Sequence, residues 1–144
     1  MSMIIKRLGQ AADTSAIYAT IQNNEGATLN RGEVVEWDLD ANVGSGVEEV
    51  DSATPQNVAG VVEDATIADT AEGLIQVYGL HDAVLTNTTL TAGAAASADT
   101  ESSVGKAVDH SASTDLAANA ALGIIGATLE VNDTNSAKIF LRCM

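Results

Sequence analysis

Alternating apolar and polar residues run through most of this chain and predict β-strands. In Ala16–Ile21 the side chains of Ile17, Ala19 and Ile21 alternate with Tyr18, Thr20 and Gln22, which gives the period of two expected of a strand. Six further segments carry β-branched or alternating apolar residues: Glu33–Trp37, Asn57–Asp64, Gly73–Leu85, Ser103–Asp109, Leu122–Val131 and Ala137–Cys143. Within the long fourth segment, Gly79 is expected to form a β-bulge. A single helix is predicted at Ser113–Leu122, with Ser113 or Thr114 as its N-cap.

These elements predict an all-β fold, either a small barrel or a sandwich-like domain, with short loops and little helix. A chain of 144 residues fits one domain. We expect residues 1–15 to form an N-terminal arm and residues 16–144 to form a single β domain. The segments VAGVVED, SVGKAVD and ALGIIGA each place a glycine near the start of a strand, where another backbone can approach closely.

The charge of the chain narrows the classes of partner that it can bind. The formal net charge is −14, and the span from Gly32 to Gly105 holds 14 carboxylates and no lysine or arginine. This excess argues against nucleic acid and anionic membranes as partners, because both require cationic contacts. Four of the six basic residues lie near the ends of the chain: Lys6, Arg7, Lys138 and Arg142. If the termini meet in the fold, these residues form a basic patch.

Small side chains and few aromatic rings leave little material for a cofactor pocket, and no cofactor is expected. The aromatic residues are Tyr18, Trp37, Tyr78 and Phe140. Cys143 is the only cysteine, which excludes a disulfide within the chain and suggests an incidental thiol. The N-terminal segment lacks the long apolar core of a signal peptide, and no apolar run reaches the roughly 20 residues of a membrane span. Synthesis in the cytoplasm is expected.

One acidic stretch partly matches a calcium-binding loop. In DLDANVGSGVEE, Asp38, Asp40, Asn42 and Glu49 occupy positions 1, 3, 5 and 12 of an EF-hand loop. Position 6 requires glycine for a sharp turn but is Val43, and the preceding EVVEW is β-like where a helix is required. These four residues are therefore a weak metal candidate, and an acidic, glycine-rich hairpin loop is favoured.

The His81–Asp82 pair is the other candidate for chemistry. Neighbouring strand residues point to opposite faces, so Asp82 is badly placed to orient the His81 ring. Asp109–His110 has the same difficulty, and neither a nucleophile motif, a phosphate-binding loop nor a zinc-ligand spacing accompanies either histidine. We expect His81 to be structural and the protein not to be an enzyme.

The order of these short motifs resembles that of small capsid decoration, or cement, proteins of tailed bacteriophages. The likeness covers roughly residues 17–141 and rests on the following segments: TIQNNEGATLNRGEVVEWD, NVAGVVEDATI, GLIQVYGLHDAVL, LTAGAAASADTESSVGKAVD, ALGIIGATLEV and KIFLR. The acidic insert at residues 38–55 is not part of the pattern. The resemblance implies a β-rich, often trimeric virion protein on the exterior of the capsid. Its partners would be the major capsid protein and further copies of itself, with host cytoplasm as its location during assembly.

A capsid contact through both ends of the chain follows as a hypothesis. Ile4 and Ile5 would supply apolar contact, while Lys6, Arg7, Lys138 and Arg142 would supply positive charge. An N-terminal arm that becomes ordered only on assembly would suit a protein that stays soluble beforehand, although a frayed terminus without a partner explains the same residues. The alternatives are another virion β module, associated with a tail or fibre, or a calcium-dependent binding domain.

Overall fold

The computed structural model describes residues 3–7, 15–39, 46–50, 57–98, 105–110 and 124–143, and confirms the predicted all-β class. Each of the seven predicted strands overlaps an observed strand, whereas the predicted helix at Ser113–Leu122 lies outside the described residues. The strands are β1 (Met3–Arg7), β2 (Ser15–Asn23), β3 (Leu29–Asn30), β4 (Val34–Trp37), β5 (Gly46–Glu49), β6 (Val58–Val62), β7 (Thr66–Ile67), β8 (Glu72–Leu85), β9 (Ala95–Ala98), β10 (Ala107–Asp109), β11 (Ile124–Val131) and β12 (Ser136–Arg142).

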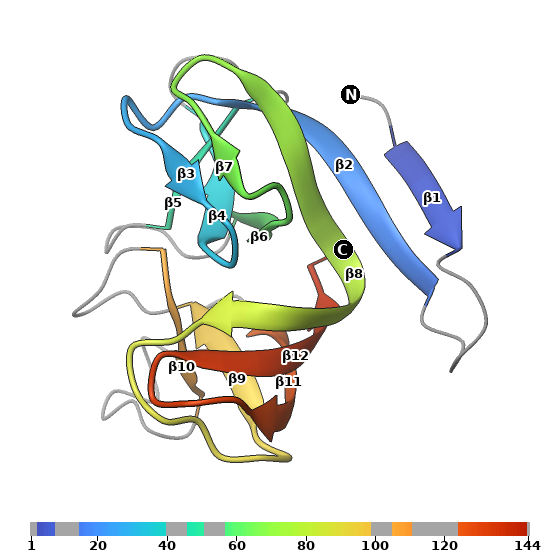
Figure 1. The fold of residues 1–144 in the computed structure, drawn as a ribbon, viewed down its shortest axis with the longest axis vertical. Helices are drawn as coiled ribbons and strands as arrows, with labels where there is room; N and C mark the ends of the chain where they lie inside the picture. The colour runs from blue at the N-terminus through green and yellow to red at the C-terminus, as the bar shows by residue number, and fades with distance from the viewer. Residues whose placement is uncertain are drawn as a thin grey trace.

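Five strands close into a small first barrel, in the order β2, β5, β4, β6 and β8, with β8 pairing back onto β2. The β2–β5 pair is parallel and the other pairs are antiparallel. This barrel occupies the upper half of Figure 1. Its core is made of small and medium apolar side chains, namely Ala19, Ile21, Leu29, Val35, Val47, Ala59, Val62, Ile67, Ile75 and Val77. Closure leaves most of these strands without a free edge.

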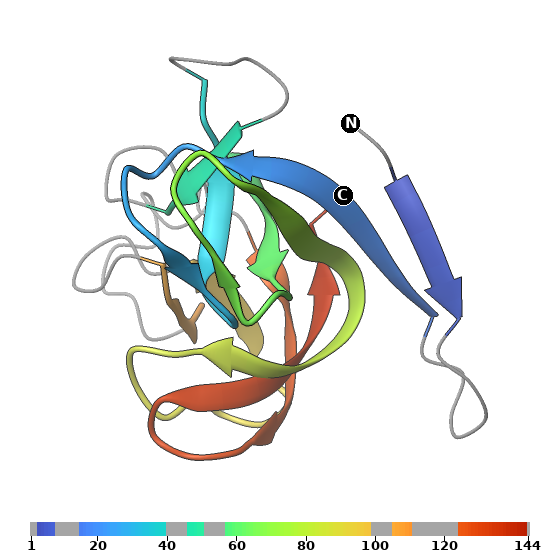
Figure 2. The ribbon, with the colours of Figure 1, turned by 45° about the horizontal axis from the view of Figure 1, so that its top comes forward.

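The second half of β8 continues into another curved sheet, in the order β8, β12, β11, β9 and β10. An isolated parallel bridge between Thr86 and Ala107 connects the end of β8 to β10, so this sheet also curls towards closure. We call it the second barrel. It forms the lower half of Figure 1, and the turned view in Figure 2 shows the two barrels overlapping. Its core includes Val84, Leu90, Ala96, Ala98, Ala107, Ile125, Ala137, Ile139 and Leu141.

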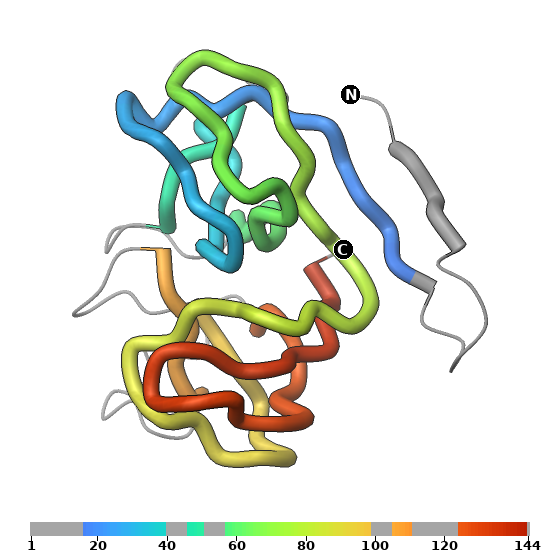
Figure 3. The backbone as a smooth tube through the Cα atoms, in the orientation of Figure 1, coloured from blue at the N-terminus to red at the C-terminus, as the bar shows by residue number. Residues whose placement is uncertain are grey.

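Strand β8 belongs to both barrels and bends between them, as the tube in Figure 3 shows. Tyr78 lies at the bend, since it pairs with Ile17 of β2 on one side and with Arg142 of β12 on the other. Gly79 follows with a φ of 98°, a conformation that a side chain would strain. The bulge was predicted at Gly79 but lies two residues earlier, because the register shift against β2 leaves Val77 as the extra residue.

Strands β4 and β6 face both cores, which explains the consecutive valines in each of them. Val34 and Val61 contribute to the second core while Val35 and Val62 contribute to the first, and all four are fully buried. A strand buried on both faces has no polar side to alternate with. Gly60 of β6 illustrates the close packing, since a Cβ there would lie 2.6 Å from the carbonyl oxygen of Gln76. The expectation that strand glycines permit close backbone approach therefore holds at this position.

The N-terminal segment forms an edge strand in this structure. Residues of β1 pair antiparallel with β2, from Met3 opposite Ala19 to Arg7 opposite Ser15. At one level of the sheet, the register runs from Ile5 to Ile17 and Tyr78 and ends at Arg142. The two terminal strands thus lie in one sheet, separated by β2 and β8, which places their backbones about 14 Å apart at the usual strand spacing.

Candidate functional site

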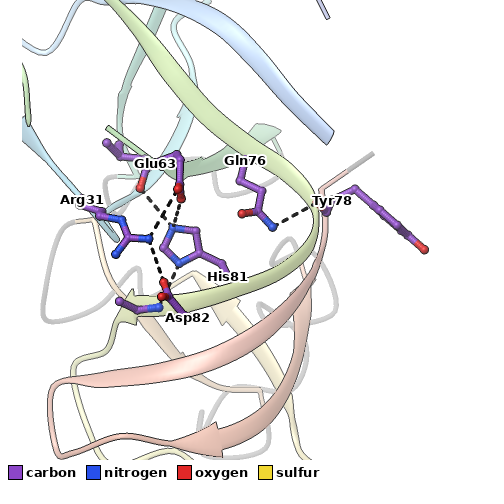
Figure 4. Close-up of polar contacts among 8 residues, drawn as sticks. Arg31, Glu63, Gln76, Tyr78, His81 and Asp82 are labelled. Carbon is purple, nitrogen blue, oxygen red and sulfur yellow. Dashed lines mark hydrogen bonds and ion pairs between the residues drawn. The ribbon is translucent and has the colours of Figure 1, made fainter. Parts of the chain in front are cut away.

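A polar cluster lies where the two barrels meet, and it contains the histidine–aspartate pair singled out in the sequence (Figure 4). Arg31 comes from the turn between β3 and β4, Glu63 follows β6, and His81 and Asp82 are consecutive in β8. The guanidinium Nη2 of Arg31 lies 2.9 Å from Oδ1 of Asp82 and 3.5 Å from Oε1 of Glu63. The other oxygen of Glu63 lies 3.3 Å from Nε2 of His81. Three segments distant in sequence are therefore joined by charge and hydrogen bonds.

His81 uses both of its ring nitrogens within the protein. The backbone N–H of Ala83 donates to Nδ1 at 3.2 Å, so the proton of the neutral ring resides on Nε2. That nitrogen lies 3.3 Å from the carbonyl oxygen of Val62 and can donate to it. The ring is buried, with 1% of the residue exposed, and burial lowers the pKa of His81 to about 4. A neutral imidazole with both nitrogens engaged connects β8 to β6 and leaves no nitrogen open for acid–base chemistry.

Asp82 points away from the ring, as the period of two predicts. Its carboxylate is 61% exposed and binds Arg31, whereas the His81 side chain is fully buried. The sequence did not reveal Arg31 or Glu63 as partners, because both are distant from β8 in the chain. Both residues come close to the histidine only because the first barrel closes, and no local sequence pattern predicts that closure. The cluster therefore links β8 to two segments of the first barrel at the junction of the barrels.

The acidic loop is confirmed as a hairpin between β4 and β5, which pair antiparallel. Asp38 is buried and accepts a hydrogen bond of 2.9 Å from Nδ2 of Asn24, while Glu49 lies at the end of β5. Asp40 and Asn42 lie outside the described residues. Within the described ranges, no group of three or more histidine, cysteine or acidic side chains could hold a metal ion.

Glu49 has a more unusual environment than the calcium-loop pattern implies. Its backbone N–H donates to Oε2 of Glu25 at 2.7 Å, and its side chain is hydrogen-bonded to Glu33. Burial, followed by repulsion from Glu33 and Glu25, raises the pKa of Glu49 to about 7. Its side chain packs beside Gly105, whose carbonyl accepts from Val34 N–H at 2.8 Å. This carboxyl therefore titrates near neutrality at a contact between the two barrels.

The basic residues predicted to touch a capsid are divided between two strands. Lys6 and Arg7 belong to β1, together with Ile4 and Ile5. Lys138 and Arg142 lie on β12, where burial alternates strictly: Ala137, Ile139 and Leu141 are fully buried and the residues between them point outward. Lys138 forms an ion pair of 2.7 Å with Glu130, while no described carboxylate pairs with Arg142. The sheet register relates the two strands, but the contact with a capsid remains a prediction.

Two partly buried aromatic rings contact each other, and Tyr78 also packs against the first core. Tyr78 and Phe140 meet edge to face, with ring centroids 5.2 Å apart and planes at 81°. In Figure 4 the Tyr78 side chain points away from the polar cluster. The KIFLR segment already contained the signal, since its period of two puts Lys138, Phe140 and Arg142 on one side. The sequence analysis used the charges and missed the ring between them.

Cys143 is a structural thiol. It is partly buried, its Sγ lies 3.7 Å from the carbonyl oxygen of Ile125, and burial raises its pKa to about 12. A group that stays protonated at neutral pH is a poor nucleophile. Among the described residues there is also no helix long and apolar enough to cross a membrane. No protein-family model, no curated protein and no solved structure matches this chain.

Proposed function

We propose that this protein decorates the exterior of a tailed-bacteriophage head and stabilises the junctions between capsomers. The observation that carries the proposal is the order of short glycine-, alanine- and valine-rich strands along residues 17–141, which resembles that of decoration proteins. Two small barrels that share β8 support it, because a clamp between capsomers requires a body that does not deform. The major capsid protein and further copies of the chain, as a homotrimer, are the proposed partners.

A non-enzymatic role fits the chemistry of the described residues. The buried histidine is neutral and fully hydrogen-bonded, and the only cysteine is held as a thiol. Neither group offers the activated nucleophile or general base that covalent or acid–base catalysis needs. The net charge of −14 supports a protein that must remain dispersed at high concentration before it assembles on the virion.

Decoration is tested by incubating the purified protein with expanded, undecorated heads and sedimenting them through a density gradient. We expect the protein to co-sediment, to saturate at a fixed number of copies per head, and to raise the temperature at which the heads release DNA. Free protein that stays at the top of the gradient at every concentration would contradict the proposal. The same assay on unexpanded heads is the control for specific recognition of the mature surface.

The contribution of the N-terminal strand is tested by deleting residues 1–7. The fold should survive, because β2 retains its pairing with β5 and β8 when β1 is removed. We expect the shortened protein to keep its far-ultraviolet circular dichroism spectrum but to bind heads more weakly. Equal binding and equal protection by both forms would show that Ile4, Ile5, Lys6 and Arg7 are not contact residues.

A further inference from the structure

The outer surface of β12 differs from the rest of this acidic molecule. We call Tyr78, Lys138, Phe140 and Arg142 the β12 face, because the β12 residues point outward at every second position and Tyr78 is paired with Arg142. The aromatic pair is only half-buried, and Phe140 has one cation on each side of it along β12, Lys138 and Arg142. Leu129 of the neighbouring β11 occupies a register shift against β12 and is 55% exposed.

Aromatic rings and arginine, both present on the β12 face, are residue types that protein interfaces favour. Aromatic side chains and arginine are enriched at the centre of such interfaces, where they lose contact with water. Within the described part of the chain, Arg142 forms no ion pair. The Tyr78 side chain points away from the polar cluster (Figure 4) and packs partly against the first core. The β12 face therefore has the composition of a binding surface.

Charge is divided unequally between the two barrels, and this division favours a second copy of the chain as the partner of the β12 face. Of the described residues, those from 15 to 77 carry ten carboxylates and only one basic side chain, Arg31. The described residues from 78 to 143 carry four carboxylates and three basic side chains. Over the full sequence, residues 15–77 carry a formal charge of −11 and residues 78–144 a formal charge of −4, so the first part of the chain is the more acidic. Oppositely charged surfaces on one chain favour association between copies.

We propose that the β12 face binds the acidic first barrel of a second copy of the chain. The contact is heterologous, since a different surface is used on each copy; it closes into a ring if the rotation permits and otherwise continues as a chain. A symmetric contact of two β12 faces would instead oppose positive charge to positive charge. The inference rests on the self-association within the proposed function, and it does not require a capsid.

Nucleic acid is a weaker match for this surface. Lys138 already has Glu130 as its partner at 2.7 Å, which leaves Arg142 as the available cation of the face. Phosphate binding needs several cations along a track, and the surrounding carboxylates would repel a polyanion. An acidic protein surface needs only one or two ion pairs around an apolar centre.

Sedimentation velocity over a range of concentrations tests the interface through a pair of matched variants. Arg142→Glu and Lys106→Glu both change the formal net charge from −14 to −16, but Lys106 precedes β10 and is not part of the β12 face. We expect wild type and Lys106→Glu to associate alike, and Arg142→Glu to weaken association at least tenfold. Phe140→Ser should weaken it as well, provided that its circular dichroism spectrum is unchanged.

Zero-length cross-linking with a carbodiimide identifies the opposing surface directly. In a mixture of ¹⁴N- and ¹⁵N-labelled protein, Lys138 should form mixed-isotope cross-links to carboxylates between Glu25 and Glu72. Cross-links confined to Glu130 of the same molecule would overturn the proposal, as would equal association of Arg142→Glu and wild type. Wild type that stays monomeric at high micromolar concentration also overturns it, while head binding can still succeed. Binding of a single-stranded DNA oligonucleotide that Arg142→Glu abolishes, with self-association unchanged, would assign the face to nucleic acid.

Discussion

Replacing Glu49 by glutamine should stabilise this protein at alkaline pH. The pKa of Glu49 rises from 4.5 to about 7 because its carboxyl is partly buried and lies near Glu33 and Glu25. A group whose pKa is raised by folding contributes stability that is present below its unfolded pKa and lost as the pH rises through the folded pKa. The wild type therefore loses stability between about pH 4.5 and 7, and Glu49→Gln should not share that loss.

The displacement of the pKa sets the upper limit of the effect at about 3.4 kcal/mol, at about 1.36 kcal/mol per pH unit. Because Glu49 is only partly buried, solvent screening should reduce the gain to about 1–2 kcal/mol. For a chain of this length, such a gain corresponds to a rise in melting temperature on the order of 5 °C. The amide can still donate a hydrogen bond to Glu33, so the packing should be retained.

Thermal and urea unfolding at pH 8 and pH 4.5 measure this effect, with Glu72→Gln as the control. Glu72 is an exposed carboxylate at the start of β8, and its replacement changes the net charge equally. We expect a gain at pH 8 for Glu49→Gln that shrinks towards zero at pH 4.5, and little gain for Glu72→Gln. An equal gain in both variants would show that net charge, and not the Glu25–Glu33–Glu49 contact, is responsible.

Three further outcomes follow from the structure. The ring of His81 should not titrate between pH 5 and 8 in nitrogen-detected NMR, because its pKa is lowered to about 4. Because the pKa of His81 is lower in the folded protein than in the unfolded one, the free energy of unfolding should fall by about 3 kcal/mol as the pH is lowered from 6.5 to 4. Gly126→Ala should destabilise the protein by about 1–3 kcal/mol, because the new Cβ would collide with the carbonyl oxygen of Phe140. At Gly93, by contrast, a Cβ would meet nothing within 4 Å, so only the positive φ of that residue opposes alanine. Calcium chelation should leave the melting temperature within about 1 °C, and a calcium-dependent rise that Asp38→Ala abolishes would restore the acidic loop as a site.

Local patterns predicted the strands whose own side chains specify them. The β-branched runs in β4, β6 and β8 and the alternation in β2 and β12 were recognisable because they encode burial directly. Strand β9, Ala95–Ala98, was missed because alanine and serine have weak strand preference. Ala96 and Ala98 are fully buried in the second core, and their pairing with β10 and β11 imposes the strand from outside.

The candidate site depended on distant pairing in the same way. Asp82 was correctly separated from the His81 ring by strand geometry, but its real partner Arg31 is remote in sequence and approaches only when β8 closes the first barrel. The acidic loop was recognised as a hairpin, yet the effect of Glu25 and Glu33 on Glu49 follows from three-dimensional proximity. A single sequence contains no signal for either contact.

Electron cryo-microscopy of heads reconstructed with and without the protein tests the central proposal most directly. The proposal of a decoration protein predicts additional density on the outer surface of the expanded head, at junctions between capsomers, with a shape that accommodates the two barrels. Heads without additional density, or density that appears only at the tail or its fibres, would contradict it.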